Sequence, residues 1–280
     1  MNTINIKKLN NNLYYFKHYN YKQIYVYGIN AIDILNSISI RDINNIDKAF
    51  YTFLVRNNFK KTIFGEAIII KYSSIKYLIL TESIKLYNYL KKLAKKFKHT
   101  SVYKINVYDI YSIHGAINNF SIKNHTYIVS RQGYTHIIYL EKKTLKINYL
   151  QNLNELTVDN YKFFLYNNNV ICKFNIKPKR LLFNLLYSLY SADNILVKVR
   201  PIFLSVIKYH SSLNFLPIKK APIYNMNNKK IGYVLHSFYL KNKLYPFITS
   251  IVYKYKFSKN VYVIDKYTKK QIILKYQKNY

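Results

Sequence analysis

Apolar and polar positions alternate along the first part of the chain in a way that predicts strands followed by a helix. Residues around Ile24 and Val26 alternate as in a half-buried strand, and Gly28 closes that strand. An apolar face at helical spacing comes next, formed by Ile34, Leu35 and Ile38. Asn30 stands where a side-chain oxygen can cap this helix. We therefore expect a strand, a glycine turn and an amphipathic helix in this order.

Further alternating segments predict a series of strands as far as residue 140. They cover Tyr51–Val55, Thr62–Ile70, Tyr77–Leu80, Val102–Val107, Ile110–His114, Thr126–Ser130 and His136–Leu140. Between residues 82 and 97, Leu86, Leu90, Leu93 and Phe97 recur at helical spacing, which predicts an amphipathic helix from Glu82 to Phe97. Lysines gather toward the end of this helix, where positive charge is favourable. The first half therefore reads as an α+β layer.

The second half predicts weaker structure followed by short strands. Residues 148–169 are polar and rich in Asn, which favours a connection with little regular structure, and Pro178–Ser191 holds a short helical pattern. Evenly spaced short strands then favour a small antiparallel barrel: Ile195–Val199, Ile223–Tyr224, Ile231–Ser237, Phe247–Tyr253, Val261–Ile264 and Gln271–Tyr276. We therefore expect one region over 1–194 and a C-terminal barrel over 195–280.

The charge of the chain points to an anionic partner, but composition weakens the argument. The sequence has 45 Lys and Arg against 11 Asp and Glu, a formal net charge of +34. Such a charge is typical of proteins that bind RNA or a membrane surface. However, frequent Lys, Asn, Ile and Tyr with no Trp are what an AT-biased genome produces, and the basic residues are spread along the whole chain. Binding to RNA or ribosomes is therefore kept as an alternative.

Several classes of protein are disfavoured by what the sequence lacks. The single cysteine, Cys172, excludes an internal disulfide and a cysteine-rich metal site. No long uncharged apolar run predicts a membrane span, and the first residues have no secretory pattern. We therefore expect a soluble protein of a reducing compartment, either bacterial cytoplasm or a mitochondrial-type matrix, with no membrane partner.

Catalytic motifs are equally scarce. The glycines form no nucleotide-binding loop, and the histidines show no zinc-hydrolase spacing, so we expect no bound metal. His114 and His136 are interpreted as strand residues beside turns, and no carboxylate has a companion at catalytic spacing. This pattern favours a binder of an anionic or aromatic ligand over a hydrolase.

One stretch carries a family resemblance. Its residues Gly28, Ala31, Leu35, Ser39, Asp42 and Ile43 match, without a gap, a block of the folate-binding superfamily that contains the glycine-cleavage aminomethyltransferases and the YgfZ-type iron–sulfur assembly proteins. The strands of Ala49–Ile70, the helix of Glu82–Phe97 and the residues Ile113-His114-Gly115 follow in the family order. Ala221–Tyr224 and Lys230–Val234 resemble the start of its C-terminal barrel. The resemblance implies an aminomethyltransferase-like α+β fold and tetrahydrofolate as cofactor.

Two branches of this superfamily compete. The early position of Gly28 and the chain length favour the YgfZ type, whereas Ser130–Thr135 resembles the R-T-G-Y-T-G-E motif of the aminomethyltransferases. Ile137 stands where that enzyme has its pterin-contacting glutamate. Gly65 stands near its catalytic aspartate, with Glu66 beside it as a substitute. The loss of this glutamate and of this aspartate counts against aminomethyl transfer, which needs a carboxylate near the folate nitrogen.

The YgfZ motif K-G-C-Y-x-G-Q-E is also altered. The corresponding segment begins at Lys198, which is retained, and Arg200 occupies the cysteine position. The resemblance then implies a site made of Asp42, Glu66, Arg131, Lys198 and Arg200, in a cavity between the α+β layer and the barrel. Its cations would neutralise the glutamate tail of a folate, while Tyr or Phe rings stack on the pterin.

The leading interpretation is a YgfZ-like tetrahydrofolate-binding accessory protein without a catalytic nucleophile. Its partners would be iron–sulfur enzymes or their assembly machinery. The first alternative is a shortened aminomethyltransferase of the glycine cleavage system that depends on Glu66. The second is a basic RNA- or ribosome-binding protein driven by charge.

Overall fold

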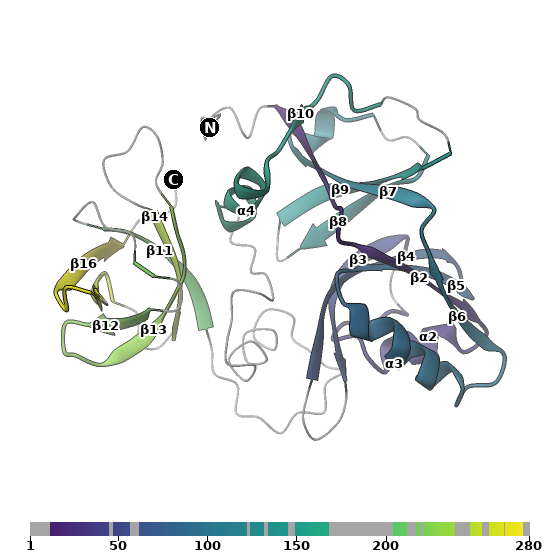
Figure 1. Cartoon of the computed structure of the whole chain (residues 1–280), viewed down its shortest axis with the longest axis horizontal. Coiled ribbons are helices and arrows are strands. Elements are labelled where there is room, and N and C mark those ends of the chain that lie inside the picture. The colour runs from purple at the N-terminus through teal and green to yellow at the C-terminus, as the bar shows by residue number, and fades with distance from the viewer. Residues whose placement is uncertain are drawn as a thin grey trace. The chain divides into compact units, whose positions relative to one another are not determined.

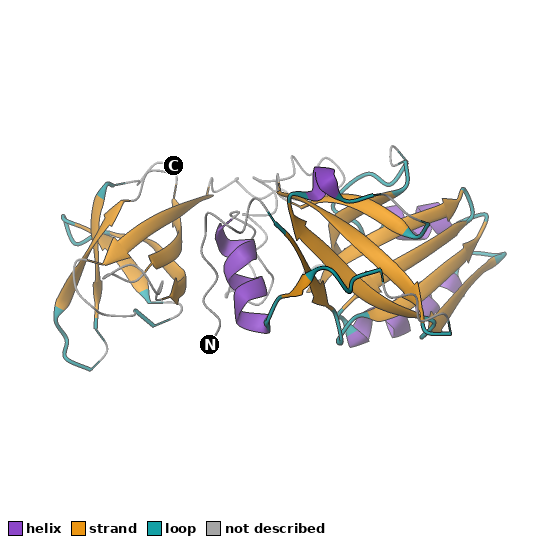
Figure 2. Ribbon diagram, turned by 90° about the horizontal axis from the view of Figure 1, so that it is seen from above, coloured by secondary structure: helices purple, strands orange, loops and turns teal. Residues whose placement is uncertain are grey.

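The computed structural model describes residues 12–44, 47–56, 62–121, 124–131, 134–144, 149–167, 204–211, 217–218, 221–238, 247–253, 258–265 and 267–276. These residues fall into two compact units, an N-terminal unit within residues 12–167 and a C-terminal unit within residues 204–276 (Figure 1). Antiparallel strands dominate both units, and Figure 2 shows how small the share of helix is. The described chain is therefore mostly β with few helices.

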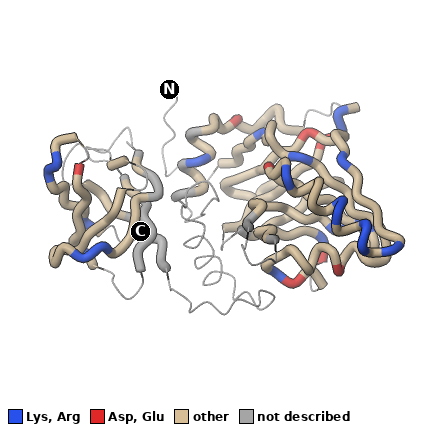
Figure 3. The backbone as a smooth tube through the Cα atoms, turned by 60° about the horizontal axis from the view of Figure 1, so that its bottom comes forward, with Lys and Arg blue, Asp and Glu red and all other residues tan. Residues whose placement is uncertain are grey.

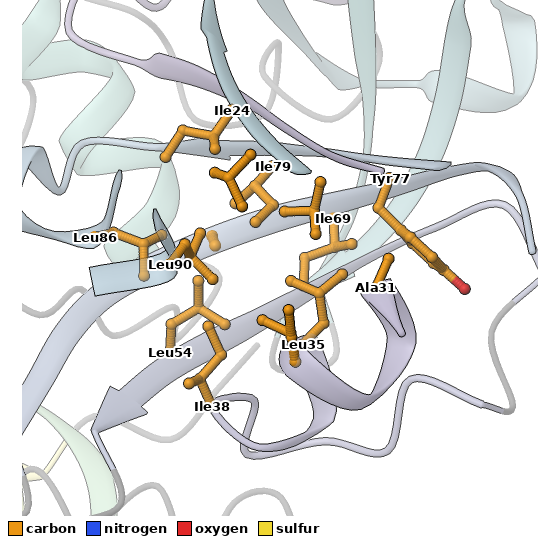
Figure 4. Packing of buried hydrophobic residues seen from close by; sticks show 14 of the residues in the cluster. Ile24, Ala31, Leu35, Ile38, Leu54, Ile69, Tyr77, Ile79, Leu86 and Leu90 are labelled. Atoms are coloured by element: carbon orange, nitrogen blue, oxygen red, sulfur yellow. The ribbon is translucent and has the colours of Figure 1, made fainter. Parts of the chain in front are cut away.

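The first sheet of the N-terminal unit has five strands in the order β3-β4-β5-β2-β6. All its pairs are antiparallel, and its strands are β3 (Ala49–Arg56), β4 (Thr62–Ser73), β5 (Lys76–Thr81), β2 (Lys22–Gly28) and β6 (Thr100–Ile105). Helices α2 (Ala31–Asn36) and α3 (Ile84–Ala94) share an apolar core with this sheet. In Figure 4, Leu35 of α2 and Leu90 of α3 lie against Ile69 and Ile79 of the strands.

Gly28 is required where β2 meets β6. Its φ is +134°, and a Cβ there would lie 2.0 Å from the carbonyl oxygen of His99. A larger residue would clash with backbone that has no room to move. The predicted cap of α2 is wrong, because the Asn30 side chain makes no capping bond and instead donates from Nδ2 to the carbonyl of Lys98 at 2.9 Å. Asn30 therefore ties the start of α2 to the segment before β6.

The predicted helix at Glu82–Phe97 is shorter in the structure. It begins at Ile84, because the Thr81 hydroxyl accepts the backbone N–H of Ser83 at 3.2 Å and holds the preceding residues in a turn. Of the predicted face, Leu86 and Leu90 are buried and Leu93 and Phe97 are partly buried, while Ala94 completes the buried side. The apolar pattern thus gives the face of the helix correctly and overstates its length.

The second sheet also has five strands, in the order β10-β1-β7-β9-β8. They are β10 (Asn154–Glu155), β1 (Leu13–Lys17), β7 (Tyr108–Gly115), β9 (Tyr134–Lys142) and β8 (Thr126–Arg131), and all pair antiparallel except β10 with β1. A short 3-10 helix, η1 (Ile117–Asn119), follows β7. The irregular connection expected over 148–169 is wrong, since this segment holds β10 and α4 (Val158–Asn167). Phe164 of α4 is buried against Tyr14 and Leu156, and this contact outweighs the polar composition.

The two sheets pack against each other. In β4 the consecutive residues Ala67, Ile68, Ile69 and Ile70 are all at most 2% exposed, so both faces of the strand are covered. The helices cover the face of Ala67 and Ile69, and the second sheet covers the other. Gln23 of β2 joins the sheets, because its Nε2 donates to the carbonyl of Tyr108 at 2.6 Å and its Oε1 accepts the N–H of Tyr108 at 3.1 Å.

The C-terminal unit is a closed ring of six strands in the order β11-β14-β13-β12-β15-β16. They are β11 (Leu204–Ser211), β14 (Phe247–Tyr253), β13 (Lys230–Phe238), β12 (Pro222–Asn225), β15 (Asn260–Ile264) and β16 (Gln271–Tyr276), and β16 pairs back with β11. Tyr209, Ile223, Val261 and Leu274 are buried in its core. The predicted helix at Pro178–Ser191 and strand at Ile195–Val199 lie outside the described residues.

Candidate functional site

Glu66 lies in β4 directly opposite Phe53 of β3. Alternation along the strand puts it on the face of Ile68, which is turned toward the second sheet. Its side chain is half-buried, and its carbonyl accepts the hydroxyl of Thr81 at 2.7 Å. A carboxylate in such a position is held by the strand and is suited to accept a hydrogen bond from a ligand N–H.

Arg131 ends β8, and its Cα is the partner of Tyr134 across the β8–β9 hairpin. The backbone of Arg131 is described, and its side chain is not. Tyr134 is stacked on two histidines, with its ring centroid 5.8 Å from His114 and 5.7 Å from His136. The segment that resembles the aminomethyltransferase motif therefore leads into a row of aromatic rings.

The strand directions place Glu66 and Arg131 toward the same end of the N-terminal unit. One pocket is lined both by Asp47 and Lys48, which precede β3, and by Thr126 and Tyr127, which begin β8. Strands β3 and β8 are in contact, and both begin beside this pocket. Glu66 pairs with the second half of β3 and Arg131 ends β8, so both lie away from the pocket.

Asp42 holds the loop that follows α2. Its Oδ1 accepts the N–H of Asn44 at 2.9 Å, which is an ordinary turn bond. The neighbouring segment is fixed along β3, because the N–H of Ile40 donates to the carbonyl of Phe53 at 3.1 Å. The carboxylate of Asp42 thus has a structural bond, and a role for it in ligand binding stays a prediction. Lys198, Arg200 and Cys172 lie outside the described residues, so the place of Lys198 and Arg200 in the site stays a prediction.

A buried chain of polar side chains crosses the second sheet. His18 Nε2 lies 2.8 Å from Ser112 Oγ, His114 Nε2 lies 2.8 Å from the same oxygen, and His114 Nδ1 lies 2.7 Å from the Tyr134 hydroxyl. Ser112 and His114 are fully buried, and His18 is 9% exposed. Tyr161 and Phe164 of α4 cover the chain, with ring centroids 5.4 Å and 5.2 Å from His114. Four groups are therefore joined, three of them buried and the fourth, Tyr134, partly exposed.

Protons on this chain can be ordered in one direction throughout. If the Tyr134 hydroxyl donates to His114 Nδ1, then His114 carries its proton on Nε2 and donates to Ser112, which donates to His18. Shifting each proton by one bond would leave Tyr134 as a phenolate and His18 as an imidazolium, so the reversed order stays neutral only if Tyr134 takes up a proton and His18 Nδ1 gives one up. Burial raises the pKa of Tyr134, so its hydroxyl keeps its proton at neutral pH. The chain is thus a hydrogen-bonded relay that ends beside the β8–β9 hairpin.

Sequence reasoning missed this relay. It interpreted His114 and His136 as strand residues beside turns, and it gave His18 no role. A signal was available in part, because Ser112 and His114 are two residues apart in a predicted strand and must share a face. Their partners are His18, which directly follows β1, and Tyr134 of β9, and no local pattern connects these residues to them.

Other kinds of site are absent from the described part of the chain. Among those residues, no group of three or more His, Cys, Asp or Glu side chains is placed to hold a metal ion. In the same residues no helix is long and apolar enough to cross a membrane. Lys17 Nζ forms an ion pair with Asp109 Oδ2 at 3.2 Å. Figure 3 shows that basic residues outnumber acidic ones in the described parts of both units.

Comparisons with known proteins agree with this architecture at the level of the fold. No family model matches the chain, and no curated protein matches it by sequence. The crystal structure of glycine cleavage system aminomethyltransferase T from Bartonella henselae matches with a TM-score of 0.70, over 95% of this chain and 85% of that one, at 13% identity. The chain has an aminomethyltransferase T-like fold.

Two positions of the chain can be compared with the carboxylates that the aminomethyltransferase resemblance implies. The resemblance expects a carboxylate at position 137, and the structure has Ile137 there, 2% exposed and packed with Tyr111, Ile113 and Tyr139. It expects an aspartate near position 65, and the structure has Gly65 at a φ of +150° next to the half-buried Glu66. Of these two carboxylate positions, only the second has an acidic neighbour.

Proposed function

We propose that the protein binds tetrahydrofolate and acts as a YgfZ-like accessory protein in the assembly or repair of iron–sulfur enzymes, without transferring an aminomethyl group. The observation that carries the proposal is the aminomethyltransferase T-like fold over 95% of the chain. The sequence resemblance links this fold to a reduced folate. Glu66, the β8–β9 hairpin and the relay at Tyr134 are the parts of the described structure that we assign to the ligand.

The absence of transfer chemistry is argued from Ile137. Its side chain is part of an apolar cluster on the second sheet, so an acidic group at this place would have to be buried among Tyr111 and Ile113. Transfer also needs a positioned group that takes part in proton movement at the folate nitrogen. Glu66 alone is left to do this. One carboxylate is enough to accept a hydrogen bond from a pterin N–H. The second carboxylate contact of the aminomethyltransferases, at the position of Ile137, is then missing.

Arg131, Lys198, Arg200 and Asp42 are proposed to complete the binding site. The cations would pair with the carboxylates of the folate tail by charge-assisted hydrogen bonds. The Tyr134 hydroxyl, held by His114 at 2.7 Å, offers a fixed polar group beside Arg131. The relay behind it would let this hydroxyl act as donor or acceptor without becoming charged.

Isothermal titration calorimetry of the full chain with tetrahydrofolate tests the proposal. We expect saturable binding of one ligand per chain, and we expect Glu66→Gln to weaken it about tenfold, the loss of one charge-assisted bond. Asp33→Asn is the matched control, because it removes one exposed negative charge from α2 of the same unit. The absence of heat at millimolar ligand would overturn the proposal, and so would equal losses in the two variants.

A second candidate is an aminomethyltransferase, which the solved neighbour favours because that protein is one. It is tested by supplying tetrahydrofolate and an aminomethyl-loaded lipoyl carrier and measuring methylenetetrahydrofolate. We expect none above the uncatalysed rate. Product formation that Glu66→Gln abolishes would establish the enzyme in place of the accessory protein.

The accessory role has its own test. An iron–sulfur enzyme is damaged with oxidant, and recovery of its activity is followed with the protein present, with and without tetrahydrofolate. We expect faster recovery that depends on the folate and is lost in Glu66→Gln. Folate binding without any effect on recovery would leave a folate-binding protein and remove the iron–sulfur role.

A further inference from the structure

The last 80 residues of the chain differ from the rest in their acidic residues. Residues 201–280 contain 15 lysines and one acidic residue, Asp265, whereas residues 1–200 contain 30 basic and 10 acidic residues. The bias toward lysine affects the whole chain, so it does not account for the scarcity of acids in this part. The C-terminal unit therefore carries an almost uncompensated positive charge, which attracts polyanions.

Asp265 adds little negative charge to the surface, because it is 5% exposed and its carboxylate is used within the turn between β15 and β16. Its Oδ1 accepts the backbone N–H of Tyr267 at 3.2 Å, and its Oδ2 accepts that of Thr268 at 3.0 Å. The N–H of Lys269 donates to the Asp265 carbonyl at 3.0 Å. These bonds fix the turn that presents Tyr267, which is 83% exposed, to solvent.

The hairpin of β15 and β16 also exposes apolar side chains on its outer face. Val263 and Leu274 belong to the core of the unit. Alternation along the strands therefore puts Tyr262, Ile264 and Ile273 on the opposite, outer face. Ile264 and Ile273 are 41% and 42% exposed, and Ile273 lies directly opposite Tyr262 in the pairing of the strands. An apolar stripe thus runs over the outside of this hairpin.

Tyrosine rings continue the stripe onto the neighbouring strands. Tyr224 of β12 lies directly opposite Tyr262, and their rings stack with centroids 5.4 Å apart. The Tyr262 hydroxyl donates to Oδ1 of Asn228 at 2.9 Å, which holds this ring in place. Lys230 of β13 lies opposite Tyr224, and its Nζ is 4.1 Å from the ring centroid of Tyr233. The outer surface therefore combines rings with ammonium groups.

Exposed lysines lie at both ends of the stripe. Lys269 and Lys270 belong to the β15–β16 turn, and Lys275 lies opposite Asn260 at the start of β15. Lys270 directly precedes β16 and Lys275 belongs to it, so about 16 Å of extended chain separates them. A ligand that pairs with both ends must therefore carry several linked negative charges.

We propose that this outer surface of the C-terminal unit binds single-stranded nucleic acid, with bases against Tyr267, Ile264 and Ile273 and phosphates paired with the lysines at both ends. Bases stack on aromatic side chains in a sequence-tolerant way, and lysines pair with the phosphates between them. A lipid surface supplies negative charge without flat rings, and a duplex keeps its bases stacked on one another. The proposal does not depend on the folate site.

The probe is a fluorescein-labelled oligouridylate, titrated with the full chain and followed by fluorescence anisotropy at several salt concentrations. We expect binding that weakens as salt rises, and weaker binding of the duplex with oligoadenylate. Tyr267→Ala should weaken binding about tenfold, through the loss of one stacked base. Lys270→Gln combined with Lys275→Gln should lower the slope of log affinity against log salt by about 1.4, the value for two phosphate contacts.

Matched controls come from the N-terminal unit. Tyr19→Ala removes a ring that is 75% exposed, and Lys91→Gln combined with Lys92→Gln removes two exposed charges from α3. Both controls should leave the affinity nearly unchanged. Losses equal to those of the C-terminal variants would show general attraction to a basic protein and overturn the proposal. The changed residues are exposed, and an unchanged thermal unfolding curve checks that each variant folds.

Two further results would also overturn the proposal. One is the absence of binding at about 100 µM protein, the weak limit of non-specific binding at physiological salt. The other is binding to vesicles of phosphatidylserine and phosphatidylcholine that Tyr267→Ala abolishes, without binding to the oligonucleotide. This second result would assign the surface to a lipid bilayer.

Discussion

The two sheets of the N-terminal unit have the same number of strands but bury different kinds of side chain. The first sheet packs aliphatic residues such as Ile24, Ile69 and Ile79 against Leu35 and Leu90 of its helices. The second sheet buries Ser112, His114 and His136 beside the aromatic residues of α4. Burial of aliphatic side chains stabilises a core whatever their orientation, whereas a buried chain of polar groups is tolerated only when each group is hydrogen-bonded. The first sheet therefore supplies an aliphatic scaffold that carries Glu66, and the second sheet supplies the polar relay.

The largest expected effect comes from a cavity in the scaffold. Leu90→Ala removes a fully buried side chain from between α3 and the first sheet. We expect a loss of about 2–5 kcal/mol in the free energy of unfolding, measured with urea. Leu93→Ala, on the same helix and only partly buried, is the control and should cost less. Equal losses would mean that the core does not lie where the structure places it.

A smaller loss is expected when the polar relay is cut. Ser112→Ala and His114→Phe each leave buried partners unsatisfied, and each should cost about 1–3 kcal/mol. Because the two side chains are 2.8 Å apart in one chain, their effects should not add, and a double-mutant cycle should show coupling of about 0.5–3 kcal/mol. Strictly additive losses would contradict the relay.

Alkaline pH should also lower stability through buried tyrosines of the second sheet. Burial raises the pKa of Tyr111 and of Tyr139, both in the second sheet, from 10.0 to about 12. Between pH 10 and pH 12 the unfolded chain loses these protons while the folded chain keeps them, so the free energy of unfolding falls with rising pH. The double variant Tyr111→Phe, Tyr139→Phe should show a shallower fall. Tyr103→Phe, at an exposed residue of β6, should leave the slope unchanged.

The smallest effect is expected on the outside of the scaffold. Lysines 85, 91, 92, 95, 96 and 98 of α3 and the residues after it are exposed. If they are a solvated face, changing Lys91, Lys92, Lys95 and Lys96 to Gln should reduce RNA binding only slightly and equally for all RNA sequences. Affinity is measured by fluorescence anisotropy over a range of salt. A steep salt dependence with preference for one RNA over generic polyanions would instead favour the RNA-binding alternative.

Sequence patterns predict the main strands of both sheets and miss the elements that depend on distant contacts. Gly28 and the apolar face of α2 are local features, and β3, β4 and β5 lie where alternation predicts them. Helix α4 was missed because Phe164 is buried by contacts with Tyr14, which is distant in sequence. The relay was missed for the same reason, since His18, His114 and Tyr134 meet only after three strands have paired. Of the predicted site, Glu66 and the backbone of Arg131 both lie away from the beginnings of β3 and β8. Asp42 makes a hydrogen bond within a turn.

Hydrogen–deuterium exchange with and without tetrahydrofolate tests the central claim most directly. The account predicts slower exchange in peptides that cover β4 around Glu66 and the β8–β9 hairpin, with α3 and the pocket at Asp47 and Lys48 unchanged. No change in exchange anywhere, or protection confined to α3 or to the pocket, would contradict a folate site at Glu66 and Tyr134.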